Sequence, residues 1–416
     1  MGDAVRIEVE HLTDPTAQPL VLTDTDWQGY TITSDMMTMA DSFDVELRPS
    51  RELLTWFRIP GHKIRIYLDG ALRLKGVVES APITTEEDRL SLRLAGRDYG
   101  LFLVDNAAPA VTFNTTTMAQ VVEALLRPVQ AYITRVELDP AANRYRVTGQ
   151  KGMAGKKSAL YRGITTERSY ELRTKAGDKI GQRIEWLAEQ IGCATWLGAQ
   201  GELIIARPDY SQAPLYKPLY VHMDAAGNVI GSNCRLSHSG DIGDRHGLIS
   251  MIAQGTDSAS AVGVDCAEMF DYVADPSESF FRFDAGAVSM TRTLPKTDVL
   301  VTQGAVDAKA VRRAARSRME ERAVKSAEIT VSLDGHRQDE QTPLWACDTV
   351  VDVDFRPRDI AAPYYIRRVV LRGGESGRTT ELGAIPSNIW LAVDHDTMGD
   401  SAYLSRQRQL WDRYAL

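Results

Sequence analysis

The chain has 416 residues, 44% of them hydrophobic and 25% charged, and its formal net charge is -8. This length provides two to four domains with hydrophobic cores of their own, and the acidic balance argues against a surface that binds nucleic acid throughout. No apolar run approaches the ~20 residues of a membrane span, and the charged N-terminal sequence MGDAVRIEVEHLTD lacks the apolar stretch of a signal peptide. We therefore expect a globular protein that neither spans a membrane nor is exported.

Residues 1–112 are predicted to be all β. Alternating apolar residues mark short strands near the N-terminus and continue through the stretch 43–98. Within that stretch, Asp69 and Gly70 separate two alternating runs and predict a tight hairpin. We expect a first tube-like β-barrel of about six or seven strands.

Residues 113–231 change in character and are predicted to form an α+β module. A cap at 115–117 begins a helix that ends at Pro128, and a second helix begins near Asp178. The apolar residues that share one face of each helix are Met118, Val121, Val122, Leu125 and Leu126 in the first, and Ile180, Ile184, Leu187 and Ile191 in the second. Between the helices, segment 143–179 carries ten Lys and Arg residues, which predicts a long basic surface loop.

The rest of the chain returns to β structure. Residues 232–256 and 327–390 are predicted to form a second tube-like β-barrel, interrupted by an insert at 257–326. The insert leads into a long helix over 307–327, with a narrow stripe of small residues on one face. The polar face of this helix is a candidate basic surface, formed by Arg312, Arg313, Arg316, Arg318 and Arg322. Residues 391–416 form a C-terminal tail.

The second β-region repeats the pattern of the first in weaker form. The matching segments are FDVELRP, TWFRIPGHKIRIYL, RLKGVV and RLSLRLAGRD in the first copy, and ITVSLDG, TPLWACDTVVDVDF, YYIRRVVL and RTTELGAI in the second. The alternation aligns Ile64, Ile66 and Leu68 with Val351, Val353 and Phe355. Two interpretations stay open, an internal duplication or two unrelated β-domains. The predicted fold class is α+β and mostly β, with two β-barrels related by duplication, an α+β module and an inserted segment.

Catalytic and metal-binding patterns are scarce. The sequence has no HExxH, GxSxG or EF-hand spacing, and the glycines of 149–158 enclose five residues where a phosphate-binding loop needs four. The segment 238–246 gathers two His and two Asp residues, which is either a metal site or a solvated turn broken by its glycines. Asp44, Glu46 and Glu79 alternate with apolar residues, as on the solvated face of a sheet. We predict no catalytic residue, cofactor or metal site.

The cysteines give no sign of a disulfide framework. Cys193, Cys234, Cys266 and Cys347 lie far apart in the sequence, and no two of them form a CxxC pair. This usage predicts a reducing compartment and no zinc site.

The basic helix and the basic loop allow two interpretations. Positive side chains bind the phosphates of nucleic acids, but no aromatic residues interleave on the helix to stack bases. The small-residue stripe suits close packing against a sheet or another helix. We therefore favour a solvated or partner-facing surface over direct recognition of nucleic acid.

Several segments spread over most of the chain follow one another in a familiar order. They are AGRDYGLFLVDNAA (95–108), TMAQVVEALLRPV (117–129), RIEWLAEQIGCATWLGAQGELIIARP (183–208), DIGDRHGLISMIAQG (241–255) and AVDAKAVRRAARSRMEERAVKSAEITVSLDGH (305–336), then the PLW segment at 343–353. In this order they resemble the baseplate hub proteins of contractile phage tails, the Mu-type tail hub and late control protein D family, which is related to the N-terminal half of type VI secretion spike proteins. The long basic loop and the C-terminal tail depart from that pattern.

The resemblance implies a structural, non-enzymatic virion protein that forms a homotrimer. In such hubs both β-barrels share the tail-tube fold, so three chains present six similar lobes between a sixfold tube and a threefold spike. The implied partners are the tail tube and central spike proteins, extending to tape measure and baseplate wedge proteins. DNA would pass through the channel without sequence-specific contacts. The implied location is the virion tail baseplate, after assembly in the host cytoplasm.

The positions of the loops predict where the neighbouring proteins bind. In the first barrel, the hairpin tip at Asp69 and Gly70 is a candidate interface. In the second barrel, the corresponding candidates are Arg356, Arg358 and Asp359. These assignments follow from loop position alone.

Two other functions remain open at the level of sequence. One is an enzyme, a peptidoglycan hydrolase carried on the hub. The other is the hub of a non-contractile tail or a related injection system, whose barrels would have the same sequence pattern. Clearing of bacterial cell walls by the purified protein would favour the first, and the absence of a neighbouring sheath gene would favour the second.

Overall fold

A computed structural model describes most of both predicted β-regions and parts of the chain between them. The described residues are 5–12, 16, 18–86, 89–109, 116–138, 145–148, 168–171, 174, 177–190, 193–206, 208–209, 212–231, 234–238, 248–254, 271–274, 297–303, 328–358, 360–375 and 377–387. The predictions for 149–158, 239–246, the helix at 307–327 and the tail at 391–416 lie outside these residues. None of the described helices is long and apolar enough to cross a membrane.

Strands β1 to β8 form what we call the first β-unit, one part of a 15-stranded sheet. They are β1 (Val5–Glu10), β2 (Leu20–Leu22), β3 (Trp27–Asp35), β4 (Ser42–Leu47), β5 (Lys63–Leu68), β6 (Ala71–Ser80), β7 (Ile83–Glu86) and β8 (Arg89–Asp98). Their order in the sheet is β3-β4-β8-β6-β5-β1-β2, and β7 also pairs with β8. A short helix, α1 (Arg51–Trp56), separates β4 from β5, and the Ser50 side chain caps it by accepting a hydrogen bond from the Leu53 amide.

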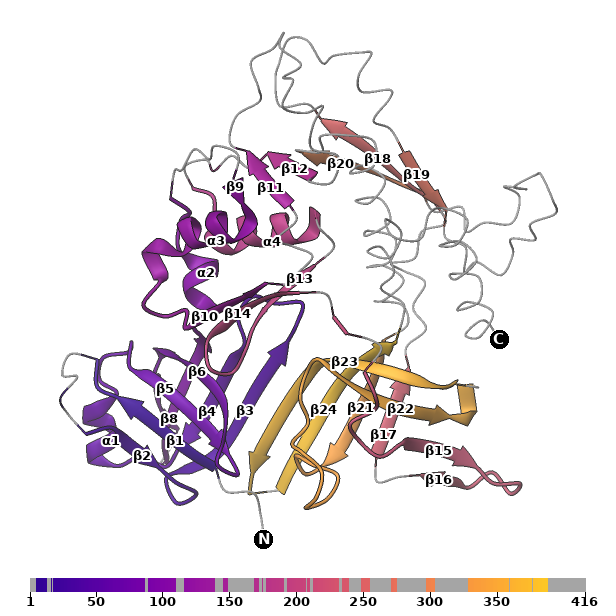
Figure 1. Cartoon of the computed structure of the whole chain (residues 1–416). Helices are drawn as coiled ribbons and strands as arrows, with labels where there is room; N and C mark the ends of the chain where they lie inside the picture. The colour runs from indigo at the N-terminus through magenta and orange to yellow at the C-terminus, as the bar shows by residue number, and fades with distance from the viewer. Residues whose placement is uncertain are drawn as a thin grey trace.

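The remaining strands of this sheet form the second β-unit. They are β15 (Leu219–Met223), β16 (Val229–Gly231), β17 (Cys234–His238), β21 (Ile329–Asp334), β22 (Thr349–Phe355), β23 (Ile360–Gly374) and β24 (Gly377–Pro386). Their order is β17-β21-β24-β23-β22-β15-β16. The two units lie side by side in Figure 1, the first coloured indigo to purple and the second rose to yellow, and β3 of the first pairs with β23 of the second.

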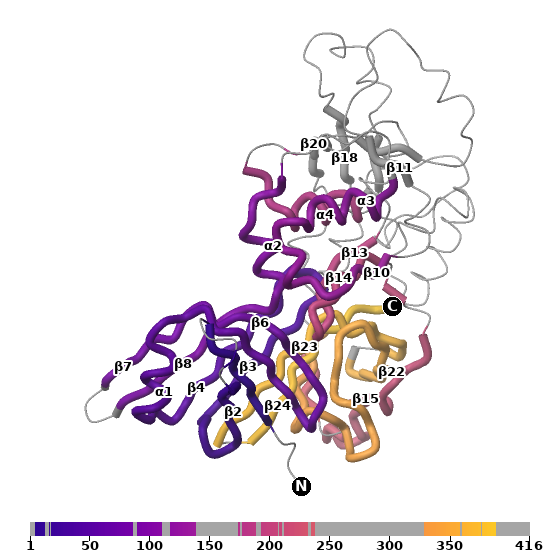
Figure 2. The backbone as a smooth tube through the Cα atoms, turned by 60° about the vertical axis from the view of Figure 1, so that its left-hand side comes forward, coloured from indigo at the N-terminus to yellow at the C-terminus, as the bar shows by residue number. Residues whose placement is uncertain are grey.

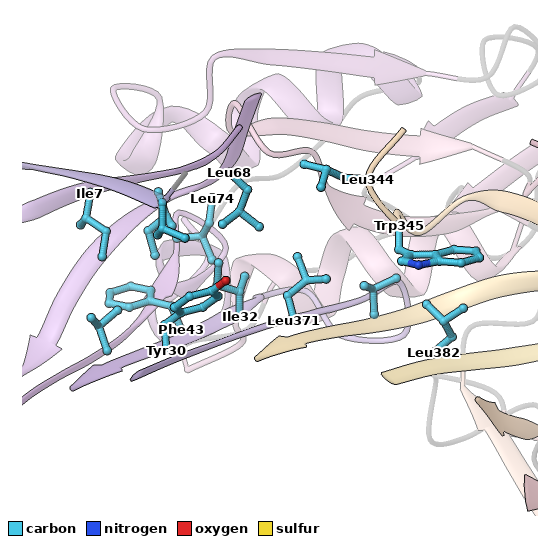
Figure 3. Close-up of a cluster of buried hydrophobic side chains, with 14 of the residues drawn as sticks. Ile7, Tyr30, Ile32, Phe43, Leu68, Leu74, Leu344, Trp345, Leu371 and Leu382 are labelled. Carbon is cyan, nitrogen blue, oxygen red and sulfur yellow. The ribbon is translucent and has the colours of Figure 1, made fainter. Parts of the chain in front are cut away.

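The two β-units share one hydrophobic core. Period-2 alternation buries Val5, Ile7 and Val9 of β1 while Arg6 between them is exposed. The same cluster of buried side chains includes Tyr30 and Ile32 of the first unit together with Val369, Leu371 and Leu382 of the second. Figure 3 shows side chains from both units in this cluster. The units are therefore packed together, as well as joined by backbone hydrogen bonds.

The expected pair of separate barrels is not what the described strands form. Their ladders follow an open path from β2 to β16, with β7 and the β24-β21-β17 series as branches, so neither unit closes into a barrel. Instead, β3 and β23 pair with each other across the two units and join them into one sheet. The broader prediction of a mostly β, α+β fold is confirmed.

A small α+β module lies beside the first β-unit (Figures 1 and 2). It contains α2 (Leu101–Asp105), α3 (Met118–Leu126), the 3-10 turn η1 (Arg127–Val129), α4 (Ile180–Gln190) and the sheet of β10 (Arg135–Leu138), β14 (Glu202–Ala206) and β13 (Ala194–Leu197). Thr117 and Gln120 form a capping box at the start of α3. The predicted apolar faces are confirmed, because the described members are buried together: Met118, Val121, Val122, Leu125, Leu126, Ile180, Ile184 and Leu187.

Two further three-stranded sheets complete the described structure. One contains β9 (Thr116–Thr117), β11 (Tyr145–Thr148) and β12 (Arg168–Glu171). The other contains β18 (Leu248–Gln254) between β19 (Asp271–Ala274) and β20 (Thr297–Gln303). The strand at 248–254, which the sequence assigned to the second barrel, therefore pairs outside the second β-unit.

The two β-units have the same strand order. β4-β8-β6-β5 in the first and β21-β24-β23-β22 in the second follow each other in the same sequence, and these strands come from the four pairs of matching segments. β3 beside β4 and β17 beside β21 extend the correspondence. The outer strands differ in direction, because β1 is antiparallel to β5 whereas β15 is parallel to β22.

A β-bulge marks the same position in both units. The register of β6 against β8 shifts at Glu79, and that of β23 against β24 shifts at Arg367. Counting ladder partners from the bulge aligns Ile64 of β5 with Val351 of β22, as the sequence predicted. A bulge is a specific local feature that alternation alone does not produce. The correspondence ends near Ile66, because the register of β5 against β6 shifts between Ile66 and Tyr67, whereas that of β22 against β23 does not shift.

Candidate assembly surfaces

The contact between the two β-units, which we call the junction, is a continuous antiparallel ladder. It pairs seven residues of β3 with β23, from Asp35 opposite Arg368 to Gly29 opposite Gly374. Ile32 and Leu371, which face each other in the ladder, are 2% and 4% exposed. Burial of apolar side chains on one face and a complete row of backbone hydrogen bonds along the ladder make this a fixed contact.

A buried polar network crosses the junction. The Tyr30 hydroxyl of β3 lies 2.6 Å from Nε2 of His336, and the other ring nitrogen of His336 lies 3.1 Å from the Thr380 hydroxyl. Thr380 in turn donates a hydrogen bond of 2.7 Å to the Gly335 carbonyl. Because His336 is fully buried, these partners satisfy polar groups that water does not reach. The network therefore ties the first unit to the loop after β21.

Close packing accompanies this network. Gly373 of β23 lies opposite Tyr30 in the ladder. A Cβ atom added at Gly373 would lie 2.3 Å from the Tyr30 ring, well inside contact distance. A side chain at this position would therefore force the neighbouring aromatic ring or the ladder to move.

The bulge residue of β23 forms ion pairs at the end of the junction. Arg367 lies 3.3 Å from Asp35 of β3 and 2.7 Å from Glu328, and all three side chains are mostly buried. The bulge residue of the first unit is also charged, since Glu79 forms an ion pair of 2.6 Å with Arg97. Only Arg367 uses its position to link the two units.

Two carboxyl groups, those of Asp41 and Asp98, lie near the end of the junction that contains Asp35. The Asp41 side chain accepts a hydrogen bond of 3.0 Å from the Asp35 amide, and Asp98 is 5% exposed. Burial raises the pKa of Asp41 to about 7, and burial together with the charge of Asp41 raises the pKa of Asp98 well above its ordinary value. Burial also raises the pKa of the nearby Cys347 thiol. These groups are therefore held in their neutral forms at mildly acidic pH.

The hairpin tip predicted as an interface contacts the other β-unit of the same chain. Asp69 and Gly70 have φ angles of 51° and 77°, as a tight hairpin turn requires. The Asp69 carboxylate forms an ion pair with Arg337, which follows β21. The predicted turn is confirmed, and its acidic residue faces the second unit; contact with a neighbouring protein stays a prediction.

The second candidate interface lies at the 3-10 turn η5 (Arg356–Arg358). Arg356 lies 2.7 Å from Asp354, which also pairs with His222 at 2.9 Å. Although partial burial raises it, hydrogen bonds from His222 and Arg356 hold the pKa of Asp354 below its ordinary value. Asp359 and the side chain of Arg358 lie outside the described structure, as do Arg312, Arg313, Arg316, Arg318 and Arg322.

The carboxylates considered as acid–base pairs have basic partners. Asp44 pairs with Arg93 at 2.6 Å, and Glu79 pairs with Arg97. Both carboxylates line a cavity of about 410 Å³ on the face of the first β-unit. Among the described residues, no group of three or more His, Cys, Asp or Glu side chains is arranged to hold a metal ion.

The residues that join the two units were not found from the sequence. Tyr30, His336, Arg367 and Asp35 come from segments about 300 residues apart, and no local pattern links them. The two β-bulges occupy equivalent positions in the two units, but this equivalence can be recognised only from the ladders in the structure.

Comparisons with known proteins give one family match. Residues 23–98 match the model of a family described as Mu phage baseplate assembly protein GpP-like, N-terminal. This range covers β3 to β8, and so includes the strand that forms the junction. No curated protein sequence matches the chain.

Solved structures of phage tail proteins share the fold. The tail protein from Neisseria meningitidis MC58 is 21% identical, with a TM-score of 0.68 over 94% of this chain and 99% of that one. The 43 kDa tail protein of prophage MuSo2 from Shewanella oneidensis is 15% identical, with a TM-score of 0.66 over 93% and 99%. Prophage tail protein gp18 from Listeria monocytogenes EGD-e is 10% identical, with a TM-score of 0.50 over 98% and 99%.

The match and the shared fold agree with the order of elements in the sequence. The sequence identities to the solved structures are low. The similarity to these structures therefore shows the fold of the chain and not its function. The predicted resemblance to Mu-type baseplate proteins is confirmed: residues 23–98 match the model of the Mu phage baseplate assembly protein GpP-like N-terminal family, and the chain has the fold of phage tail proteins.

Proposed function

We propose that this chain is a structural baseplate hub of a contractile phage tail, acting as a homotrimer between a hexameric tail tube and a trimeric central spike. The observation that carries the proposal is the presence of two β-units with one strand order and one bulge position in a single sheet. We interpret the two units as an internal duplication. Tail-tube-like lobes that occur twice per chain are what a hub between two symmetries needs.

Symmetry gives the physical reason. Three chains in a ring supply six similar β-units, which offer six quasi-equivalent contacts to a sixfold tube. The same ring has true threefold symmetry, which matches a trimeric spike. Duplication followed by trimerisation thus resolves the mismatch with one gene product.

The partners follow from this position in the tail. The hub binds the tail tube protein on one side and the spike on the other, and contacts tape measure and baseplate wedge proteins. The candidate contacts are Asp69 and Gly70 in the first unit, and Arg356, Arg358 and Asp359 in the second. The protein acts in the virion tail baseplate after assembly in the host cytoplasm.

In this proposal DNA moves through the hub without being bound in a sequence-specific way. The ring surrounds a channel, and Lys and Arg side chains near the channel interact with phosphates irrespective of sequence. The arginines at 312, 313, 316, 318 and 322 are candidates for such a surface. No step of this function requires a catalytic group, so we propose that the protein is not an enzyme.

Mass in solution tests the trimer. The chain has a mass of 46.1 kDa, and light scattering of the purified protein is expected to give three times this value, or three times this value plus the mass of the spike when the spike is bound. A chain that stays monomeric with tube and spike proteins present contradicts the hub. Clearing of bacterial cell walls in a zymogram, lost in Glu79→Gln, would instead show a hydrolase.

A further inference from the structure

In the described part of the large sheet, β7 and β17 each have one open edge, as β2 and β16 do, and together they take the places of the two strands that form the junction. β7 pairs only with β8, and β17 pairs only with β21. In the junction within the chain, β3 is the equivalent of β17 in the other unit, and the second half of β23 is the equivalent of β7. We propose that β7 of one copy pairs with β17 of a second copy and repeats the β3–β23 junction between chains. This inference rests on the proposed trimeric hub.

The bulge aligns β7 with the second half of β23. Ser80 and Arg368 directly follow the bulge in the two units. Three residues further on, Ile83 aligns with Leu371, and the ladders with β8 and β24 continue without another shift. The segment that includes β6 and β7 is therefore an interrupted copy of the long strand β23.

The same ladders align β17 with β3. The row of ladder partners that begins beside the bulge contains Ser80, Ala95, Asp44 and Thr31 in the first unit, and Arg368, Gly383, Thr330 and Ser237 in the second. Thr31 and Ser237 are thus equivalent. Thr31 has its open side paired with β23, whereas the corresponding side of β17 has no described strand.

These alignments fix the register between chains. In the junction, Thr31 lies opposite Arg372, and the equivalent of Arg372 is Thr84. Thr84 of one copy is therefore placed opposite Ser237 of the next. A shift of one residue would turn the side chains of β7 to the wrong face, so the register is a strict requirement.

The exposure of β7 agrees with a missing neighbour. Leu371 is 4% exposed in the junction, whereas its equivalent Ile83 is 50% exposed. Ile83 lies opposite Leu92, which is fully buried, so Ile83 stands on the core face of the sheet. On β17, Leu236 packs against the shared core as its equivalent Tyr30 does. Pairing the two edges would cover Ile83 as the junction covers Leu371.

Proline before β7 does not block this edge. Pro82 accepts a hydrogen bond from the Arg93 amide of β8 through its carbonyl, so its backbone points toward β8. Backbone groups of an antiparallel strand alternate in direction, and Ile83 and Thr85 therefore present their N–H and C=O groups to the open edge. An exposed edge of this kind readily accepts another strand.

Engineered disulfides test the register. The double variant Thr84→Cys with Ser237→Cys places the two cysteines on facing residues of neighbouring copies, within the Cα distance that a disulfide spans. Thr84→Cys with Arg235→Cys is the matched control, since diagonal partners lie farther apart. Thr31→Cys with Arg372→Cys forms the equivalent bond inside one chain. Each protein is oxidised at the concentration where the trimer is measured, beside the wild-type chain and the single variants.

The expected result is a covalently closed trimer of the first variant on a non-reducing gel. Its yield should exceed that of the diagonal control by on the order of ten-fold, because only facing residues have disulfide geometry. A trimer in which neither variant links, or both link equally, overturns the β7–β17 pairing and leaves the hub proposal standing. A chain that never trimerises overturns both.

A second variant tests the side chain rather than the backbone. Ile83→Asp places a charge where the pairing buries an apolar group, so the trimer is expected to dissociate to monomers. Ile59, 63% exposed in a loop before β5, supplies the control variant Ile59→Asp, which should remain trimeric. Circular dichroism confirms that both variants stay folded. A trimeric Ile83→Asp protein with unchanged dissociation contradicts the proposed interface.

Discussion

Tyr30 and His336, separated by 306 positions in the sequence, lie 2.6 Å apart through their hydroxyl and Nε2 atoms. The contact is buried and links β3 of the first β-unit to the loop after β21 of the second. Such a contact forms only when both units are folded and docked. It therefore reports on the junction itself, and each unit alone lacks it.

Removal of the Tyr30 hydroxyl should weaken the junction. Tyr30→Phe keeps the ring but leaves the His336 nitrogen without this partner, and we expect a loss of about 1–3 kcal/mol in the free energy of unfolding. Urea denaturation measures the change. Tyr67→Phe, which removes a hydrogen bond to Glu8 inside the first unit, is the control and should cost less. Equal losses of unfolding free energy in the two variants would mean that the buried network stabilises the protein no more than the Tyr67 hydrogen bond does.

The ion pairs of Arg367 should stabilise the same contact. Arg367→Met leaves Asp35 and Glu328 side by side without their cation, and these side chains are 15% and 21% exposed. We expect a loss of about 1–3 kcal/mol, between the values for exposed and buried pairs. Arg93→Met removes an arginine that is 62% exposed and should cost less than about 1 kcal/mol in the same denaturation experiment. A junction held by apolar packing alone would show no difference between them.

The pKa of Asp41, raised to about 7, predicts a pH dependence. Between about pH 4 and pH 7 the folded chain retains a proton that the unfolded chain releases, so stability falls as the pH rises through this window and levels off above it. Asp41→Asn removes this titration and keeps an acceptor for the Asp35 amide. Its Tm should exceed that of the wild type at pH 8, with a flatter profile. Glu375→Gln, at an exposed position, should leave the profile unchanged.

The close approach of Gly373 to the Tyr30 ring predicts a steric effect. Gly373→Ala puts a methyl group 2.3 Å from the ring, and either the ring or the ladder must move. We expect a loss of about 1–3 kcal/mol, typical of overpacking. Gly374→Ala meets its nearest neighbour, the Gln28 carbonyl, at 3.3 Å and is the milder control. Thermal unfolding compares the two variants, and equal Tm values would show that the ring moves aside freely.

Sequence reasoning succeeded where the physics is local. Alternation of apolar residues identified strands such as β5 and β22, because the period of a strand fixes which residues, among them Ile64 and Val351, face the core. The Asp69-Gly70 turn followed from residues that tolerate positive φ. The apolar faces of α3 and α4 followed from helical spacing.

The same reasoning failed where the choice of partner is long-range. β3 and β23 read as ordinary strands, and nothing within either one specifies that they pair with each other. Two closed barrels were therefore expected where the described strands form one open sheet. The contacts of Tyr30 and Arg367 were missed for the same reason, since they depend on that pairing.

The core shared by the two β-units has a consequence for the shape of any assembly. Because Ile32 and Leu371 are buried together, the angle between the units is set when the chain folds, before it meets another copy. In a ring of three chains with six β-units, three of the six contacts between neighbouring units would then lie inside a chain and form when that chain folds. The angle between the two units of one chain would set the curvature of the ring, and the contacts between chains would need only to repeat that angle.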